Sequence, residues 1–210
     1  MTASGNKGFA PQEIRRWIAR SPFRYPAYDQ TEPLKGFSHL PVFPFLWDQL
    51  QGRSQIPSVE ALFEGLVQEA IPQPPPAAIE NRARKLVLDF GRELHAYTML
   101  VRLFDQVSWR AQDDLGEGID FVISLSSGSL VGVKAYMRAQ WRPEDWESIK
   151  ERRRMRRGEQ TLVIPVIPLT NFRFGADRES ASGTWLFRLV HIEEVEAAIK
   201  QLGLGYQGAL

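Results

Sequence analysis

Residues 118–137 constrain the fold of this chain more than any other stretch, because they form two apolar runs, each with one charged residue, around the short loop 126–128. A three-residue loop ending in a glycine such as Gly128 is typical of a β-hairpin, since glycine readily adopts the left-handed conformation that closes such loops. In that register Asp120 stands directly opposite Lys134. Opposed residues of antiparallel strands share one face, with Cβ atoms about 5 Å apart. We therefore expect the carboxylate and the ammonium to meet.

An isolated charge inside an apolar strand is costly to bury and needs a physical reason. One interpretation is a structural cross-strand ion pair, which is common and weak at protein surfaces. The other is a functional acid and base that the hairpin holds at one point. The rest of the sequence is needed to choose between them.

The composition limits the kinds of site that the chain can build. Its 210 residues suffice for one substantial core with an elaboration, and 43% of them are hydrophobic, as in ordinary globular proteins. The absence of cysteine excludes disulfides and thiolate zinc sites, and the histidines His39, His95 and His191 are too scattered to suggest a histidine site. Any metal should be oxygen-bound, and magnesium is the usual choice.

No segment of the sequence suggests insertion into a membrane. The first residues lack the apolar core of a signal peptide, and the longest apolar run, 162–169, is interrupted by Pro165 and Pro168. We expect a soluble, cytoplasmic protein with no membrane partner.

The first 75 residues differ in composition from the rest, because they are rich in proline and aromatic residues. Helical patterns occur at 11–19 and 58–69, the second with Ser58 as a plausible N-cap. The proline-rich segment 71–76 is typical of a stiff connector. We interpret 1–75 as an N-terminal arm or subdomain of helical and irregular structure, which could engage a partner protein or a second copy of the chain.

Residues 76–210 have the pattern of an α/β domain. The patterns predict, in chain order, a long helix at 77–104, a strand at 106–111, the two hairpin strands, a helix at 143–158, a buried strand at 161–169, a strand at 185–190 and a helix at 192–202. This order implies a mixed sheet flanked by helices.

A basic cluster falls on the predicted helix 143–158, where six of the eight residues from Lys150 to Arg157 are lysine or arginine. A helix end favours two or three cations, so six exceed what capping requires. We expect contact with nucleic acid, most naturally DNA. The residues predicted to make it are Arg138, Arg142, Lys150, Arg153, Arg154 and Arg157.

The element order, with an acid on the second strand and a lysine on the third, resembles the PD-(D/E)xK nuclease superfamily. Ile119-Asp120 is similar to the first half of its motif and Gly132-Val133-Lys134 to the second. The resemblance implies a restriction-endonuclease-like α-β-β-β-α-β core and a DNA endonuclease dependent on magnesium or manganese, of the restriction, repair or mobile-element type.

The resemblance also implies roles for individual residues. Asp120 would be the central metal ligand, and Lys134 would orient or deprotonate the attacking water. Glu93 would correspond to the superfamily's helical glutamate and complete the metal shell through a water, although it also has a plain interpretation as an exposed helix residue.

Gly132 departs from the superfamily pattern, because a carboxylate normally stands there. Glu147 or Glu151, on the predicted helix that follows, could supply the missing metal ligand. Alternatively, catalysis has been lost and the chain is a nuclease-like module that binds nucleic acid or a protein. The sequence leaves both alternatives open.

Overall fold

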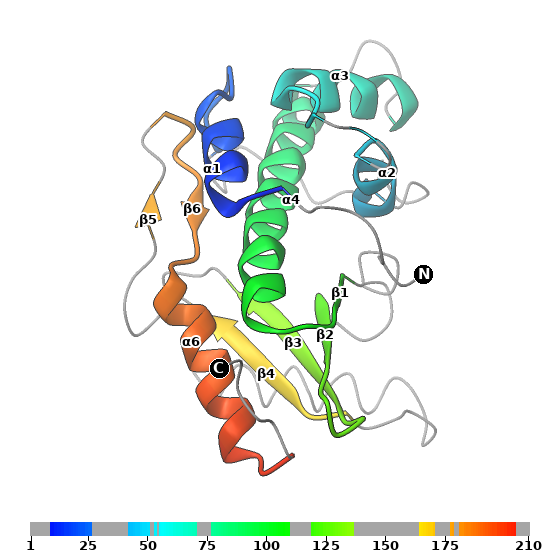
Figure 1. Ribbon diagram of the computed structural model, residues 1–210. Coiled ribbons are helices and arrows are strands. Elements are labelled where there is room, and N and C mark those ends of the chain that lie inside the picture. The colour runs from blue at the N-terminus through cyan, green and yellow to red at the C-terminus, as the bar shows by residue number, and fades with distance from the viewer. Residues whose placement is uncertain are drawn as a thin grey trace. The chain divides into compact units, whose positions relative to one another are not determined.

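The computed structural model of the protein describes residues 9–26, 42–50, 53, 55–70, 77–109, 119–136, 164–170, 177–178 and 181–204. Figure 1 draws these residues as a coloured ribbon. The chain divides into two compact units. The first comprises Met1–Met99 with Asp177–Leu186, and the second comprises Leu100–Ala176 with Phe187–Leu210. The prediction of an N-terminal arm or subdomain ending at residue 75 stays a prediction.

The described elements of the first unit are mainly helices. They are α1 (Pro11–Ala19), α2 (Val42–Asp48), α3 (Val59–Ala70), most of α4 (Ala77–Leu103), and the short strands β5 (Asp177–Arg178) and β6 (Trp185–Leu186). The predicted helices at 11–19, 58–69 and 77–104 are confirmed. Ser58 caps α3 as predicted, because its hydroxyl accepts a hydrogen bond from Ala61 N–H at 3.0 Å.

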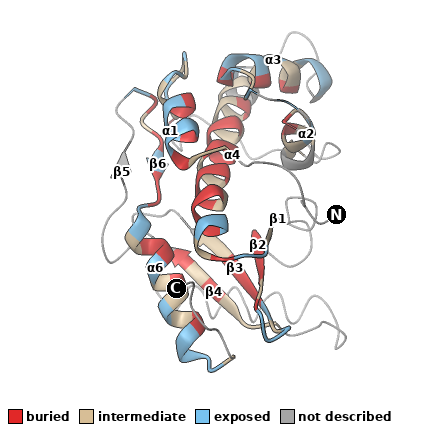
Figure 2. Ribbon diagram, viewed as in Figure 1, coloured by how far each residue is buried: buried red, intermediate tan, exposed pale blue. Residues whose placement is uncertain are grey.

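Helix α4 is the core element of the first unit, and Figure 2 shows buried residues along much of its length. Ala83, Val87 and Phe90 are fully buried at three- and four-residue spacing, as expected for the apolar face of a helix that packs on a core. Helix α1 packs closely on α4 at Gly91. A Cβ atom at Gly91 would lie 2.6 Å from Trp17 Cζ3, so only glycine allows this approach.

The second unit contains a four-stranded mixed sheet, so the predicted α/β class is confirmed. Its strands are β1 (Val107–Trp109), β2 (Phe121–Ser124), β3 (Leu130–Tyr136) and β4 (Val166–Thr170), in the order β1-β2-β3-β4. The pairs β1–β2 and β2–β3 are antiparallel, and β3–β4 is parallel. Helix α6 (Leu189–Gln201) packs against β4 and buries Ile192, Val195 and Ile199 (Figure 1).

Two element boundaries differ from the prediction by more than one residue. The strand predicted at 185–190 ends at Leu186, and α6 begins at Leu189 rather than at 192. The reason is a local cap, since Arg188 N–H donates to His191 Nδ1 at 2.9 Å and closes the first turn. The predicted strand 161–169 is described only in part, with β4 at Val166–Thr170.

Helix α2 and strand β5 were not predicted. The proline and aromatic residues around α2 favoured irregular structure, yet Pro44 falls in the first turn of α2, where a missing N–H costs little. The predicted helix 143–158 lies outside the described residues. Within the ranges that the structure describes, no helix combines the length and the apolar character needed to cross a membrane.

Candidate functional site

The hairpin of β2 and β3 has the predicted loop. Gly128 has φ +82°, the left-handed conformation that glycine favours. The loop is closed by two backbone hydrogen bonds of 2.9 Å, from Gly128 N–H to Leu125 O and from Leu125 N–H to Ser129 O. The strands pair Phe121 with Val133, and one further step in this register sets Asp120 opposite Lys134.

Asp120 and Lys134 meet as this register predicts. Lys134 Nζ lies 2.6 Å from Asp120 Oδ1, and Ala135 N–H donates to Asp120 Oδ2 at 2.6 Å. The Asp120 N–H in turn donates to Val133 O at 3.0 Å. Asp120 is 3% exposed and the Lys134 side chain 13% exposed, so the ion pair is buried.

Burial makes this pair different from a surface salt bridge. Two charges taken out of water lose hydration, and their attraction compensates only where the geometry is close and further hydrogen bonds satisfy the carboxylate. Both Asp120 oxygens accept hydrogen bonds, which meets that condition.

The structure gives a physical reason for Gly132. A Cβ atom there would lie 3.1 Å from Ile119 Cδ1 and 3.2 Å from Val166 Cγ2. Two apolar side chains therefore fill the space that a side chain at this position would enter. A carboxylate at residue 132 would have to displace them.

The roles predicted for the remaining site residues stay predictions. Glu93 lies half-buried on α4 in the first unit, whereas Asp120 and Lys134 belong to the second. The predicted ligands Glu147 and Glu151 lie outside the described residues, as do Arg138, Arg142, Lys150, Arg153, Arg154 and Arg157. Among the residues that are described, no group of three or more His, Asp or Glu could hold a metal ion.

A second polar cluster, in the first unit, was missed by the sequence analysis. Tyr25 Oη donates to Asp89 Oδ1 at 2.7 Å, Arg92 lies 2.8 Å from the same oxygen, and Lys85 pairs with Asp89 Oδ2. The spacing of Lys85, Asp89 and Arg92 at one helical turn was a usable signal. The contact with Tyr25, 64 residues away, was not visible in the sequence.

The ionisable groups of this cluster shift one another's pKa values. Burial alone would raise the pKa of Asp89, but the cations Arg92 and Lys85 outweigh it and lower that pKa below 3.8. Burial raises the pKa of Tyr25, and nearby Asp89 raises it further. Burial opposes the charge on Lys85, yet Asp89 raises the pKa of Lys85 above 10.5. The cluster is thus an ionised acid between two cations, capped by a neutral phenol.

Comparison of the chain with protein-family models, with curated proteins and with solved structures found no significant match. A functional assignment therefore rests on the residues of this chain alone.

Proposed function

We propose that this protein is a metal-dependent DNA endonuclease with a restriction-endonuclease-like core, in which Asp120 and Lys134 are the acidic and basic residues of the site. The observation that carries the proposal is their 2.6 Å contact on adjacent antiparallel strands. The described order α4-β1-β2-β3-β4, with β3 and β4 parallel, supports an α-β-β-β-α-β core. The second helix of that core is the one predicted at 143–158.

Hydrolysis of a phosphodiester requires an activated water and stabilisation of negative charge on the phosphate. Asp120 would hold a magnesium or manganese ion, and Glu147 or Glu151 would supply a second carboxylate, since such ions are bound by one or two carboxylates together with waters and substrate phosphates. A bound ion of this kind supplies Lewis-acid stabilisation and lowers the pKa of water.

Lys134 would act on the water and the phosphate. Its ammonium is a charged hydrogen-bond donor beside Asp120, and its proposed role is to donate to an attacking water or to a phosphate oxygen. The Ala135 N–H fixes the Asp120 carboxylate, which in turn holds the lysine in one position. The basic residues predicted on 138–157 would bind the DNA backbone.

A second candidate is a non-catalytic nuclease-like module that binds DNA. The observation that favours it is the apolar filling beside Gly132, where Ile119 and Val166 occupy the space of the usual second carboxylate. Such a module would use Asp120 and Lys134 only to stabilise the hairpin.

Cleavage of plasmid and of short single- and double-stranded oligonucleotides, with magnesium or manganese, tests the proposal. We expect cutting by the wild type that is lost in Asp120→Asn and in Lys134→Ala. Asp105→Ala removes an exposed acid and is the matched control, which should cut normally. Circular dichroism of each variant shows whether it has folded.

The outcomes separate the two candidates. DNA binding by the wild type without cleavage in either metal would favour the non-catalytic module. Cleavage that survives in both hairpin variants would place the active site elsewhere, and a chain that neither binds nor cuts DNA would contradict both candidates.

A further inference from the structure

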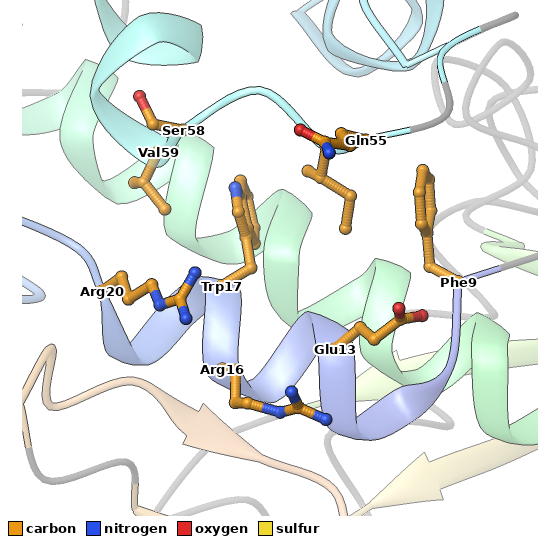
Figure 3. A pocket seen from close by; sticks show the side chains of 9 residues that line it. Phe9, Glu13, Arg16, Trp17, Arg20, Gln55, Ser58 and Val59 are labelled. Atoms are coloured by element: carbon orange, nitrogen blue, oxygen red, sulfur yellow. The ribbon is translucent and has the colours of Figure 1, made fainter.

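A pocket in the first unit lies between α1 and the chain segment that leads into α3 (Figure 3). Its volume is about 440 Å³, within the range of about 300–1,000 Å³ that is usual for small-molecule sites. Its apolar lining residues are Phe9, Trp17, Ile56 and Val59. Trp17 is 8% exposed and its indole N–H donates to Pro57 O at 2.6 Å, so this side of the pocket is firmly held.

Two arginines line the same pocket, Arg16 of α1 and Arg20, the residue that follows this helix. Arg16 and Arg20 are one helical turn apart and exposed, and neither forms an ion pair with another described residue. In Figure 3 the guanidinium of Arg20 points toward Trp17. The acid that lines the pocket, Glu13, accepts a hydrogen bond from Ala10 N–H at 2.6 Å and so helps to cap α1.

The arrangement of these arginines favours an anionic ligand. Like charges one turn apart repel each other, and the negative end of the helix dipole offsets only part of that repulsion. The dipole accounts for cations at this end of α1, but not for their position beside an aromatic wall. An arginine next to an apolar aromatic surface suits a ligand with a negative group and a flat ring.

We propose that this pocket binds a nucleoside monophosphate unit. Its base lies against Phe9 and Ile56 and meets the small accessible part of Trp17, because aromatic side chains such as Phe9 stack on any base. Its phosphate binds the guanidinium of Arg20, with Arg16 nearby, since a guanidinium forms paired hydrogen bonds with phosphate. Gln55, which also lines the pocket, offers both a donor and an acceptor to the edge of a base.

The unit can be a free nucleotide or one unpaired nucleotide of a strand, and the second source rests on the proposed action on DNA. Inorganic phosphate would leave the aromatic wall unused, and a neutral nucleoside would leave the arginines unused. Both should therefore bind more weakly than the nucleotide.

Isothermal titration calorimetry with the full chain tests the proposal, using adenosine monophosphate, adenosine, inorganic phosphate and a short single-stranded oligonucleotide as probes. We expect adenosine monophosphate or the oligonucleotide to bind, and Arg20→Gln to weaken that binding about tenfold or more, because it removes a charged hydrogen-bonding partner. Phe9→Ala should also weaken it. Arg24→Gln removes an exposed arginine of the same unit that does not line the pocket, and should bind as the wild type does.

The probes distinguish the two sources. Displacement of the oligonucleotide by adenosine monophosphate indicates that a free nucleotide fits the pocket, whereas Arg20-dependent binding of the oligonucleotide alone indicates a strand. The proposal is overturned if adenosine binds as tightly as its phosphate, or if Arg20→Gln and Arg24→Gln have equal effects. Arg20→Lys keeps the positive charge but loses the paired hydrogen bonds of a guanidinium, and should bind with intermediate affinity. It keeps the proposal testable if Arg20→Gln fails to fold.

The proposals of DNA cleavage and of nucleotide binding can be tested independently of each other. Asp120 belongs to the other unit, so Asp120→Asn should bind the nucleotide as the wild type does even though it is expected not to cut DNA. If Asp120→Asn loses cleavage but still binds the nucleotide, neither proposal is contradicted. If the wild type cuts DNA but its nucleotide binding does not depend on Arg20, only the nucleotide-site proposal is overturned.

Discussion

At the scale of single residues, the Asp120–Lys134 pair makes a prediction about coupling. Asp120→Ala takes away the carboxylate that faces the mostly buried ammonium of Lys134, which should lower the free energy of unfolding by about 3–5 kcal/mol. Replacing both residues with apolar ones, as in Asp120→Val with Lys134→Leu, should cost less than Asp120→Ala alone, because no charge is then left behind. Urea unfolding of the wild type, the single variants and the double variant measures this coupling. If the losses of unfolding free energy in the two single variants add up to that of the double variant, the pair is not coupled.

A second prediction for a single residue concerns the space beside Gly132. Because Ile119 and Val166 fill the space beside it, Gly132→Glu should lower the free energy of unfolding by at least about 1–3 kcal/mol and should not increase cleavage. Leu130→Glu, on the same strand at a residue 40% exposed, is the matched control and should change stability little. Increased cutting by Gly132→Glu would show that the superfamily's second carboxylate can be restored here.

At the scale of elements, the packing of α1 on α4 depends on Gly91. Glycine to alanine in a helix interior normally stabilises by about 0.5–1 kcal/mol. At Gly91 the added methyl group would meet Trp17 at 2.6 Å and Ile18 at 3.1 Å, so Gly91→Ala should instead destabilise by about 1–3 kcal/mol. Gly65→Ala in α3, where the nearest atom is 3.8 Å away, should follow the normal rule. Thermal unfolding of both variants checks the opposite signs.

The elements that could be predicted from the sequence are those fixed by local physics. The apolar spacing of α4 and the loop that ends in Gly128 are properties of short segments, and the loop length alone set the register that joins Asp120 to Lys134. Helix α2 was missed because the proline and aromatic residues of this segment favour irregular structure. The position of Glu93 relative to the hairpin, and the contact of Tyr25 with Asp89, depend on long-range packing that no local pattern encodes.

At the scale of the whole molecule, the cluster around Asp89 should make stability fall in acid. The pKa of Asp89 is lowered in the folded state, so its contribution is present above its ordinary value of 3.8 and is lost as the pH falls through the lower folded value. Asp89→Asn should be less stable than the wild type at neutral pH, because Lys85 and Arg92 lose their common anion. The difference should shrink as the pH falls below about 4. Urea unfolding at a series of pH values measures it, and a constant difference would contradict the assignment.

The same cluster should also make the free energy of unfolding fall at high pH, because the pKa shifts of Tyr25 and Lys85 are opposite in direction to that of Asp89. The pKa values of Tyr25 and Lys85 are raised on folding, so their contributions are complete below 10.0 and 10.5, respectively, and are lost as the pH rises through the folded values. Tyr25→Phe keeps the ring but removes the hydrogen bond to Asp89 and the titrating phenol. It should cost about 0.5–1.5 kcal/mol at neutral pH and give a shallower loss of stability above pH 10. An alkaline loss as steep as that of the wild type would mean that Tyr25 does not titrate with unfolding, and that other groups control the stability of the molecule at high pH.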